Sequence, residues 1–153
     1  MEHRYALALE WLGNLGTGTS DYRAYSRRNA LTAPGKLHDI AGSADRTFHG
    51  DAERWNPEEL LLAALSQCHM LSYLHVAVQH GIVVSAYRDA PVGVLTQEGQ
   101  GGRFTSATLR PVVTISEGDP AIADELHAEA SRLCFIANSV AFPIRHEATT
   151  LTA

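Results

Sequence analysis

One segment near the middle of the chain, residues 56–81, limits the possible folds more than any other. Asn56 is a helix N-cap residue, since its side chain can accept a hydrogen bond from an unpaired amide, and Pro57 fits the first helical position. Glu59, three residues after the cap, completes a capping box. No glycine or proline follows until Gly81, which is a natural helix stop. The sequence therefore predicts one helix about 36 Å long.

This predicted helix is apolar over most of its circumference, and a helix of that kind must be buried. A domain of 153 residues supplies limited cover, so we expect a partner subunit to provide part of it. The large apolar side chains are Leu60, Leu61, Leu62, Leu65, Met70, Leu71, Leu74, Val76 and Val78.

Composition limits the number of domains and the kinds of partner. A chain with 45% hydrophobic and 19% charged residues can bury one substantial core, which predicts a single domain over residues 1–153. The net charge is −5, and no basic run exceeds Arg27-Arg28, so nucleic acid is not an expected partner. We find no uncharged apolar stretch of about 20 residues and no signal-peptide pattern, which predicts no membrane association and a cytoplasmic protein.

Strand patterns flank the predicted helix on both sides. Apolar residues alternate over 5–11 before a glycine-rich turn at 13–18, residues 22–33 suit one or two short strands, and 38–55 is expected to be a long functional loop. After the helix, 82–95 and 104–115 form a predicted hairpin around a turn at 97–102.

A second helix and a final strand complete the predicted order of elements. Asp119-Pro120 repeats the cap-then-proline pattern and begins a second helix, and 143–150 is a predicted closing strand. The apolar stripe of this helix is predicted to be Ile122, Leu126, Ala130 and Leu133. Strands grouped in runs favour an α+β fold with antiparallel sheet.

The chain contains two cysteines, Cys68 in the long helix and Cys134 at the end of the second. Structural disulfides are uncommon in the cytosol, so these residues are either buried packing residues or redox-active thiols. Composition alone favours packing, because free cysteine is among the most buried residue types.

The segment Asn56-Pro57-Glu58-Glu59-Leu60 followed by Cys68 resembles the motif of the OsmC/Ohr family, in which a long helix opens with N-P-E-x-L and carries its reactive cysteine ten residues after the glutamate. The position of Cys134 also matches the second family cysteine. Two features depart from the family pattern: Phe135 replaces the proline after the second cysteine, and the N-terminal Gly-Gly-Arg motif is absent. The resemblance therefore points to the broader OsmC-like branch.

The resemblance implies an OsmC-like α+β fold, with antiparallel sheets packed around a long central helix in an intertwined homodimer. It also implies a thiol peroxidase that reduces organic hydroperoxides or hydrogen peroxide without a metal or bound cofactor. The expected reductant is a dithiol, such as a lipoyl-bearing protein. By the same resemblance, Cys68 is the peroxidatic residue that becomes a sulfenic acid, and Cys134 is the resolving residue that closes a disulfide with it.

A thiol in so apolar a helix needs a nearby cation to become a reactive thiolate. Arg23, Arg27 and Arg28 lie in the region where the family places its activating arginine, and Arg23 is the predicted choice. Glu58 has two open interpretations, a catalytic partner of that arginine or a stabiliser of the helix N-terminus. Because Glu58 lies about 15 Å from Cys68 along a straight helix, a catalytic role requires action across a dimer or a broken helix.

The remaining candidates are weaker. His69, His75 and His80 share the long helix at spacings that do not suit a metal site, and His69 is expected to be a packing or interface residue. A cysteine hydrolase lacks a nucleophile elbow in this sequence. A non-catalytic dimer that binds small apolar ligands, with both cysteines in its core, remains the principal alternative.

Overall fold

The computed structural model describes residues 1–153, which form two compact units, residues 1–60 and residues 61–153. The first unit contains a three-stranded antiparallel sheet in the order β1 (Ala8–Trp11), β2 (Asn29–Thr32) and β3 (Ile40–Gly42), followed by the 3₁₀ turn η1 (Arg46–Phe48). The predicted strand at 5–11 is confirmed in its second half. The segment 38–55 is not the long irregular loop that was expected, because it contains both β3 and η1.

The long helix α1 spans Pro57–Gln79, as predicted, and both of its ends are capped. At the N-terminus the Glu59 amide donates to Asn56 Oδ1 at 2.8 Å, and the Asn56 amide donates back to Glu59 Oε2 at 3.2 Å. This is the predicted capping box. At the C-terminus Gly81 has φ +69°, a left-handed conformation that glycine adopts at no steric cost. The amides of Gly81 and Ile82 close the helix as a Schellman motif.

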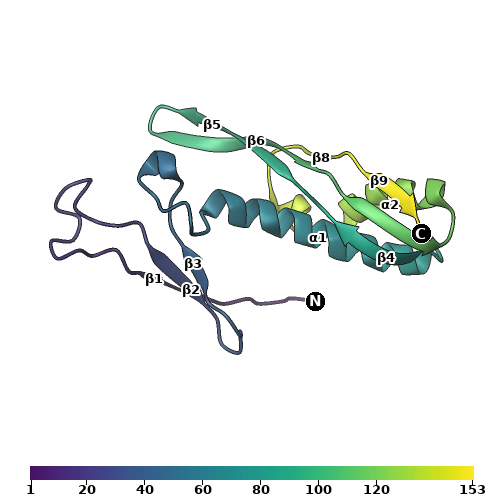
Figure 1. Cartoon of the computed structure of the whole chain (residues 1–153), viewed down its shortest axis with the longest axis horizontal. Coiled ribbons are helices and arrows are strands. Elements are labelled where there is room, and N and C mark those ends of the chain that lie inside the picture. Colours follow the sequence, from purple (N-terminus) through teal and green to yellow (C-terminus); the bar gives the residue numbers. More distant parts are fainter. The chain divides into compact units, whose positions relative to one another are not determined.

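Six strands and the helix α2 follow α1: β4 (Val83–Arg88), β5 (Val92–Glu98), β6 (Gly101–Leu109), β7 (Val112–Glu117), α2 (Pro120–Leu133), the 3₁₀ turn η2 (Ala137–Ser139), β8 (Ile144–His146) and β9 (Thr149–Thr152). They form two sheets, in the orders β4-β7-β9 and β5-β6-β8. In Figure 1 the strands of this unit run as a long ribbon beside α1.

The predicted hairpin is correct in its pairing, but each of its arms is divided into two strands. β5 pairs with β6 and β4 pairs with β7, all antiparallel. The breaks fall at Pro91 and Pro111, because proline cannot donate a hydrogen bond to a neighbouring strand. The closing strand is likewise two strands, and both pair in parallel, β8 with β6 and β9 with β7. The expected antiparallel sheet is therefore present in the hairpin strands, while these two edge strands pair in parallel.

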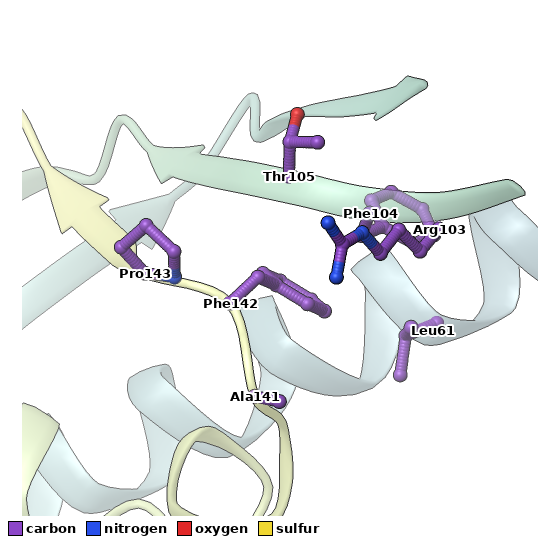
Figure 2. Close-up of a pocket in the computed structure, with 7 residues that line it drawn as sticks. All are labelled: Leu61, Arg103, Phe104, Thr105, Ala141, Phe142 and Pro143. Atoms are coloured by element: carbon purple, nitrogen blue, oxygen red, sulfur yellow. The ribbon is translucent and has the colours of Figure 1, made fainter. Parts of the chain in front are cut away.

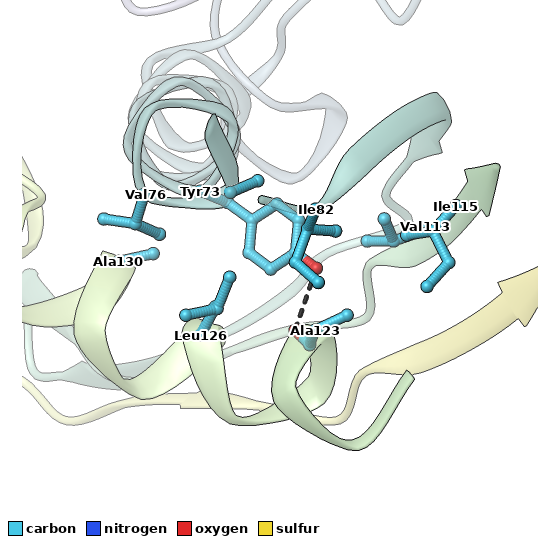
Figure 3. Close-up of a cluster of buried hydrophobic side chains, with 9 residues drawn as sticks. Tyr73, Val76, Ile82, Val113, Ile115, Ala123, Leu126 and Ala130 are labelled. Atoms are coloured by element: carbon cyan, nitrogen blue, oxygen red, sulfur yellow. Dashed lines mark hydrogen bonds between the residues drawn. The ribbon is translucent and has the colours of Figure 1, made fainter. Parts of the chain in front are cut away.

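The main core lies where α1 and α2 pack against the sheet β4-β7-β9 (Figure 3). Tyr73 of α1 points into this core, and its hydroxyl donates to the carbonyl of Ala123 in α2 at 2.8 Å. The buried stripe of α2 differs from the prediction, since Ile122 and Leu133 are exposed. The residues that α2 buries are Ala123, Leu126, His127 and Ala130.

Only one face of α1 is buried within the chain, formed by Leu65, His69, Tyr73, Val76 and Ala77. By length and composition α1 meets the criterion for a membrane-spanning helix, with a mean hydropathy of 1.4. The expectation that no stretch is long and uncharged enough is thus wrong. The core helices of soluble proteins meet the same criterion, so one such helix is weak evidence for a membrane span.

Candidate active site

The two cysteines are brought together at the end of α2. Cys68 lies in the middle of α1 and is half-buried, and Cys134 is the C-cap residue of α2, with a thiol that is almost fully buried. The chain turns after α2, so the Ala137 amide donates to the Cys134 sulfur at 3.4 Å. Both thiols are free, and the Cys68 side chain lies close enough to Cys134 to contribute to the raised pKa of its thiol. The spatial pairing expected from the family resemblance is therefore present.

The environment of Cys134 favours its neutral form. Burial raises the pKa of this thiol to about 11, and the neighbouring Cys68 side chain acts in the same direction, while the Ala137 amide opposes both. At neutral pH Cys134 thus carries its proton.

A pocket of about 400 Å³ opens directly on Cys68. Most of its wall is apolar, and its polar residues besides Cys68 are Ser72 and His75. Phe135, which departs from the family pattern, forms part of this wall beside the second cysteine. The pocket could hold a small apolar molecule against the Cys68 sulfur. Its lining residues are Cys68, Leu71, Ser72, His75, Leu133 and Phe135.

A second apolar pocket, of about 470 Å³, lies between β6, the segment before β8 and the start of α1 (Figure 2). Phe104 and Phe142 stack at 5.3 Å between ring centroids, and the Arg103 side chain extends beside them. No cysteine, serine or histidine lines this pocket. The pocket at Cys68 is therefore the stronger candidate for an active site.

A cluster of histidines between α1, α2 and β8 was not found from the sequence. His69 is buried, as expected for a packing residue, and its Nε2 lies 3.0 Å from Nδ1 of His127. His127 also stacks on Tyr73 at 4.2 Å between centroids, and its own Nε2 is buried without a hydrogen-bond partner. The exposed His146 ring lies 5.8 Å from both imidazoles. His127 could have been found by its spacing from Ala123 and Ala130 on one helical face.

Both buried histidines are held in their neutral form. Burial is the main cause of the lowered pKa of His69, about 4, with a smaller contribution from His146 and an opposing one from Asp89. Burial also lowers the pKa of His127 to about 3, with His69 and His146 adding to the effect. No group of three or more histidine, cysteine or acidic side chains converges in a way that could hold a metal ion.

The three candidate arginines differ in how they are engaged within the first unit. Arg27 is held between the rings of Tyr22 and Tyr25, with its guanidinium carbon Cζ at 4.7 and 4.0 Å from their centroids. Arg28 forms an ion pair with Asp51 at 2.9 Å. The guanidinium of Arg23 makes no hydrogen bond or ion pair, and only its backbone amide is bonded, to Asp21. Among the three, Arg23 is thus the cation that remains available.

Glu58 lies in the first turn of α1 and has no hydrogen bond, since Glu59 supplies the carboxylate of the capping box. The helix is continuous from Pro57 to Gln79, which removes a broken helix as a route from Glu58 to Cys68. The axial separation along α1 is about 15 Å, too far for a glutamate side chain. A direct role for Glu58 at the thiol of its own chain is therefore excluded, and its role across a dimer stays a prediction.

The fold and the site define a class of protein, an α+β chain in which a half-buried thiol on a long core helix meets a buried thiol from a second helix. The family model of OsmC-like proteins matches residues 50–149, and the chain belongs to the OsmC family. No curated protein sequence matches it.

Solved structures agree with this assignment. An OsmC-like protein of unknown function from Vibrio cholerae is similar at 29% identity with a TM-score of 0.86, covering 96% of this chain and 99% of the other. The organic hydroperoxide resistance protein OsmC of Legionella pneumophila has 17% identity and a TM-score of 0.65, with 98% and 99% covered. That of Elizabethkingia anophelis has 16% identity and a TM-score of 0.68, with both chains fully covered. At these lower identities the likeness concerns the fold.

The buried histidines predict that stability depends on pH. The unfolded chain has histidines of ordinary pKa near 6.5, so between about pH 6.5 and pH 4 it binds more protons than the folded chain. The free energy of unfolding should fall as the pH drops through this window, by on the order of 3 kcal/mol for one histidine with a shift of this size. Urea unfolding at about pH 7, 5.5 and 4.5 measures the effect.

The control is the double variant His69→Gln/His127→Asn, which keeps a polar side chain at both positions and cannot titrate there. Its stability should depend on pH much less than that of the natural sequence. Equal slopes in the two proteins would show that the histidines are not the buried neutral groups described above.

Proposed function

We propose that this protein is a cysteine-based peroxidase that reduces organic hydroperoxides or hydrogen peroxide. The observation that carries the proposal is the pair of neighbouring free thiols, one open to an apolar pocket and the other buried. Paired thiols of unequal exposure suit a two-step cycle in which one sulfur meets the oxidant and the other resolves the product. Family membership and the hydroperoxide resistance proteins of similar fold support this reading.

In the proposed first step the Cys68 thiolate attacks the terminal oxygen of the hydroperoxide. A sulfur–oxygen bond forms, the oxygen–oxygen bond breaks, and the alkoxide leaves and takes up a proton to become the alcohol. Cys68 is now a sulfenic acid. The apolar wall of the pocket suits the organic part of such a substrate, because burial of apolar surface contributes to binding.

In the second step Cys134 attacks the sulfur of the sulfenic acid. The disulfide forms, the sulfur–oxygen bond breaks, and the hydroxyl leaves as water with the proton of the Cys134 thiol. A dithiol then reduces the disulfide by two exchange reactions and is itself oxidised. A lipoyl-bearing protein would supply such a dithiol. The buried position of Cys134 protects it from direct oxidation and leaves Cys68 as the sulfur that meets peroxide.

We assign Arg23 as the cation that stabilises the Cys68 thiolate, because Arg27 and Arg28 are already held by neighbours in their own unit. Glu58 is proposed to orient this arginine from the partner subunit. The dimer itself is supported by exposed apolar surface. Leu7 and Leu9 at the first strand are 64% and 67% exposed, and Val78 of α1 is 79% exposed. Surface of this kind marks an interaction site, and a second copy of the chain is the proposed partner.

Thiol titration tests the peroxidase proposal directly. One equivalent of cumene hydroperoxide should remove both free thiols of the reduced protein, and a dithiol should restore them. Cys68→Ser should retain its remaining thiol, because Cys134 is buried. Two thiols that stay unreactive at neutral pH would refute the peroxidase and favour the alternative, a non-catalytic dimer that binds small apolar ligands in the pocket at Cys68.

Kinetics of Cys68 oxidation test the assignment of the arginine. Arg23→Ala should lower the rate constant for reaction with cumene hydroperoxide at neutral pH by about tenfold or more, because the reacting thiolate would lose the cation proposed to stabilise it. The matched control is Arg28→Ala, which loses an ion pair in the same unit and should change the rate less than about twofold. A larger loss in the control would reassign the role to Arg28.

Gel filtration tests the dimer. We expect elution at about twice the chain mass of 16.6 kDa, because a monomer would leave the apolar strand and the outer face of α1 in water. Elution at 16.6 kDa would contradict both the dimer and the proposed action of Glu58 across it.

A further inference from the structure

A hydrogen bond between two buried histidines connects α1 to α2 one residue after Cys68. His69 directly follows Cys68 on α1, and its Nε2 lies 3.0 Å from Nδ1 of His127, on the helix that ends at Cys134. Both rings are at least 98% buried, with exposures of 2% and 0%. A hydrogen bond in such surroundings is strong and directional, and breaking it leaves an unpaired polar atom in the core.

The rest of the contact between the two helices fixes their relative position less tightly. Its side chains are mostly small or aliphatic, and apolar contacts hold helices together without selecting one register. The Tyr73 hydroxyl also donates to the Ala123 carbonyl at 2.8 Å, a full turn further from Cys68. A third contact, between His80 just past the end of α1 and Glu129 of α2 at 3.1 Å, lies further still from Cys68 and is partly exposed. The aliphatic residues of the contact are Val76, Ala77, Leu126 and Ala130.

We infer that His69 and His127 are positioning residues for disulfide formation, because their hydrogen bond holds α1 and α2 so that the Cys134 sulfur reaches the sulfur of Cys68. The inference rests on the proposed peroxidase for the origin of the sulfenic acid. The step that it serves is the one balanced above, in which the sulfur–sulfur bond forms, the sulfur–oxygen bond breaks and water leaves. Neither imidazole is required to touch the substrate.

The hydrogen bond between His69 and His127 requires that one of the two facing nitrogens carries a proton and donates it, while the other is unprotonated and accepts. The groups that face the pair keep it neutral. His69 is faced by His127, by His146 of β8 and by Asp89 after β4, and His127 is faced by His69, His146 and Tyr73. Asp89 is itself held by the Ser66 hydroxyl and the Arg110 amide, both at 2.6 Å.

The two ends of the bond use different atoms of the imidazole, which gives a matched test. At position 69 the bonding atom is Nε2, whose place the amide of glutamine can take, while asparagine is too short. At position 127 the bonding atom is Nδ1, whose place the amide of asparagine can take, while that of glutamine extends past it. The four variants are therefore His69→Gln, His69→Asn, His127→Asn and His127→Gln.

The readout is the reduction potential of the Cys68–Cys134 disulfide, measured in dithiothreitol redox buffers without any peroxide. In His69→Gln and His127→Asn the equilibrium constant for forming the Cys68–Cys134 disulfide should stay within about threefold of that of the natural protein. His69→Asn and His127→Gln should lower it by about tenfold or more, which corresponds to a potential about 30 mV less negative. The kinetic counterpart is more sulfinic acid on Cys68 after excess hydroperoxide in the second pair, because the sulfenic acid waits longer for Cys134.

We expect glutamine to preserve the potential better than asparagine at position 69, and asparagine better than glutamine at position 127. This reversal distinguishes positioning from helix propensity or side-chain size, which favour glutamine at both positions. The same order at both positions, an unchanged potential in all four variants, or no disulfide in the natural protein would overturn the inference. Each position tests it alone, so a variant that fails to fold leaves the other pair decisive. The reduction potential could change as predicted in the four variants while the thiols of the natural protein fail to react with hydroperoxide. That result would refute the proposed peroxidase and support the positioning role of the two histidines.

Discussion

Burying a helix as apolar as α1 removes its surface from water, and the backbone groups at its two ends then need partners of their own. Asn56 and Glu59 supply them at the N-terminus, and the Schellman motif around Gly81 supplies them at the C-terminus. With both ends closed, the helix presents one continuous face to α2 and the sheet β4-β7-β9. Cys68, His69 and Tyr73 all lie on this helix, so its position relative to α2 determines where each side chain of the site lies.

The chemistry of the site follows from unequal exposure of two adjacent sulfurs. A thiol that is fully buried in apolar surroundings stays protonated, as the raised pKa of Cys134 indicates, while Cys68 opens on a pocket. In the proposed cycle the buried thiol carries its proton before oxidation and acts as the resolving nucleophile after it. The two roles require that α1 and α2 hold a fixed relation. The hydrogen bond between His69 and His127 lies where it can supply this constraint.

Much of the fold was predictable because its boundaries are marked by local chemistry. Asn56-Pro57 and Asp119-Pro120 begin helices, and Gly81 ends one, through interactions with neighbours in the sequence. The parallel pairing of β8 and β9 was not predictable, since it joins segments far apart in the sequence. The breaks at Pro91 and Pro111 could have been found, because proline at the centre of a predicted strand argues against an unbroken ladder.

The candidate site was only partly predictable from the sequence. The pairing of Cys68 with Cys134 came from the family resemblance, because spacing alone does not place two helices side by side. The partnership of His69 with His127 depends on how α1 crosses α2, which no local pattern encodes. The predicted stripe of α2 was correct at Leu126 and Ala130 and wrong at Ile122 and Leu133. Hydrophobicity alone ranks the last two above Ala123 and His127, which the folded chain buries instead.

The most direct test of the central claim is peptide mapping by mass spectrometry of the reduced protein after one equivalent of hydroperoxide, under non-reducing conditions. The two-thiol cycle predicts a peptide pair linked through Cys68 and Cys134 within one chain, lighter by two hydrogen atoms than the separate peptides. Stable oxygen adducts on Cys68 with Cys134 still free, or a disulfide between chains, would contradict it.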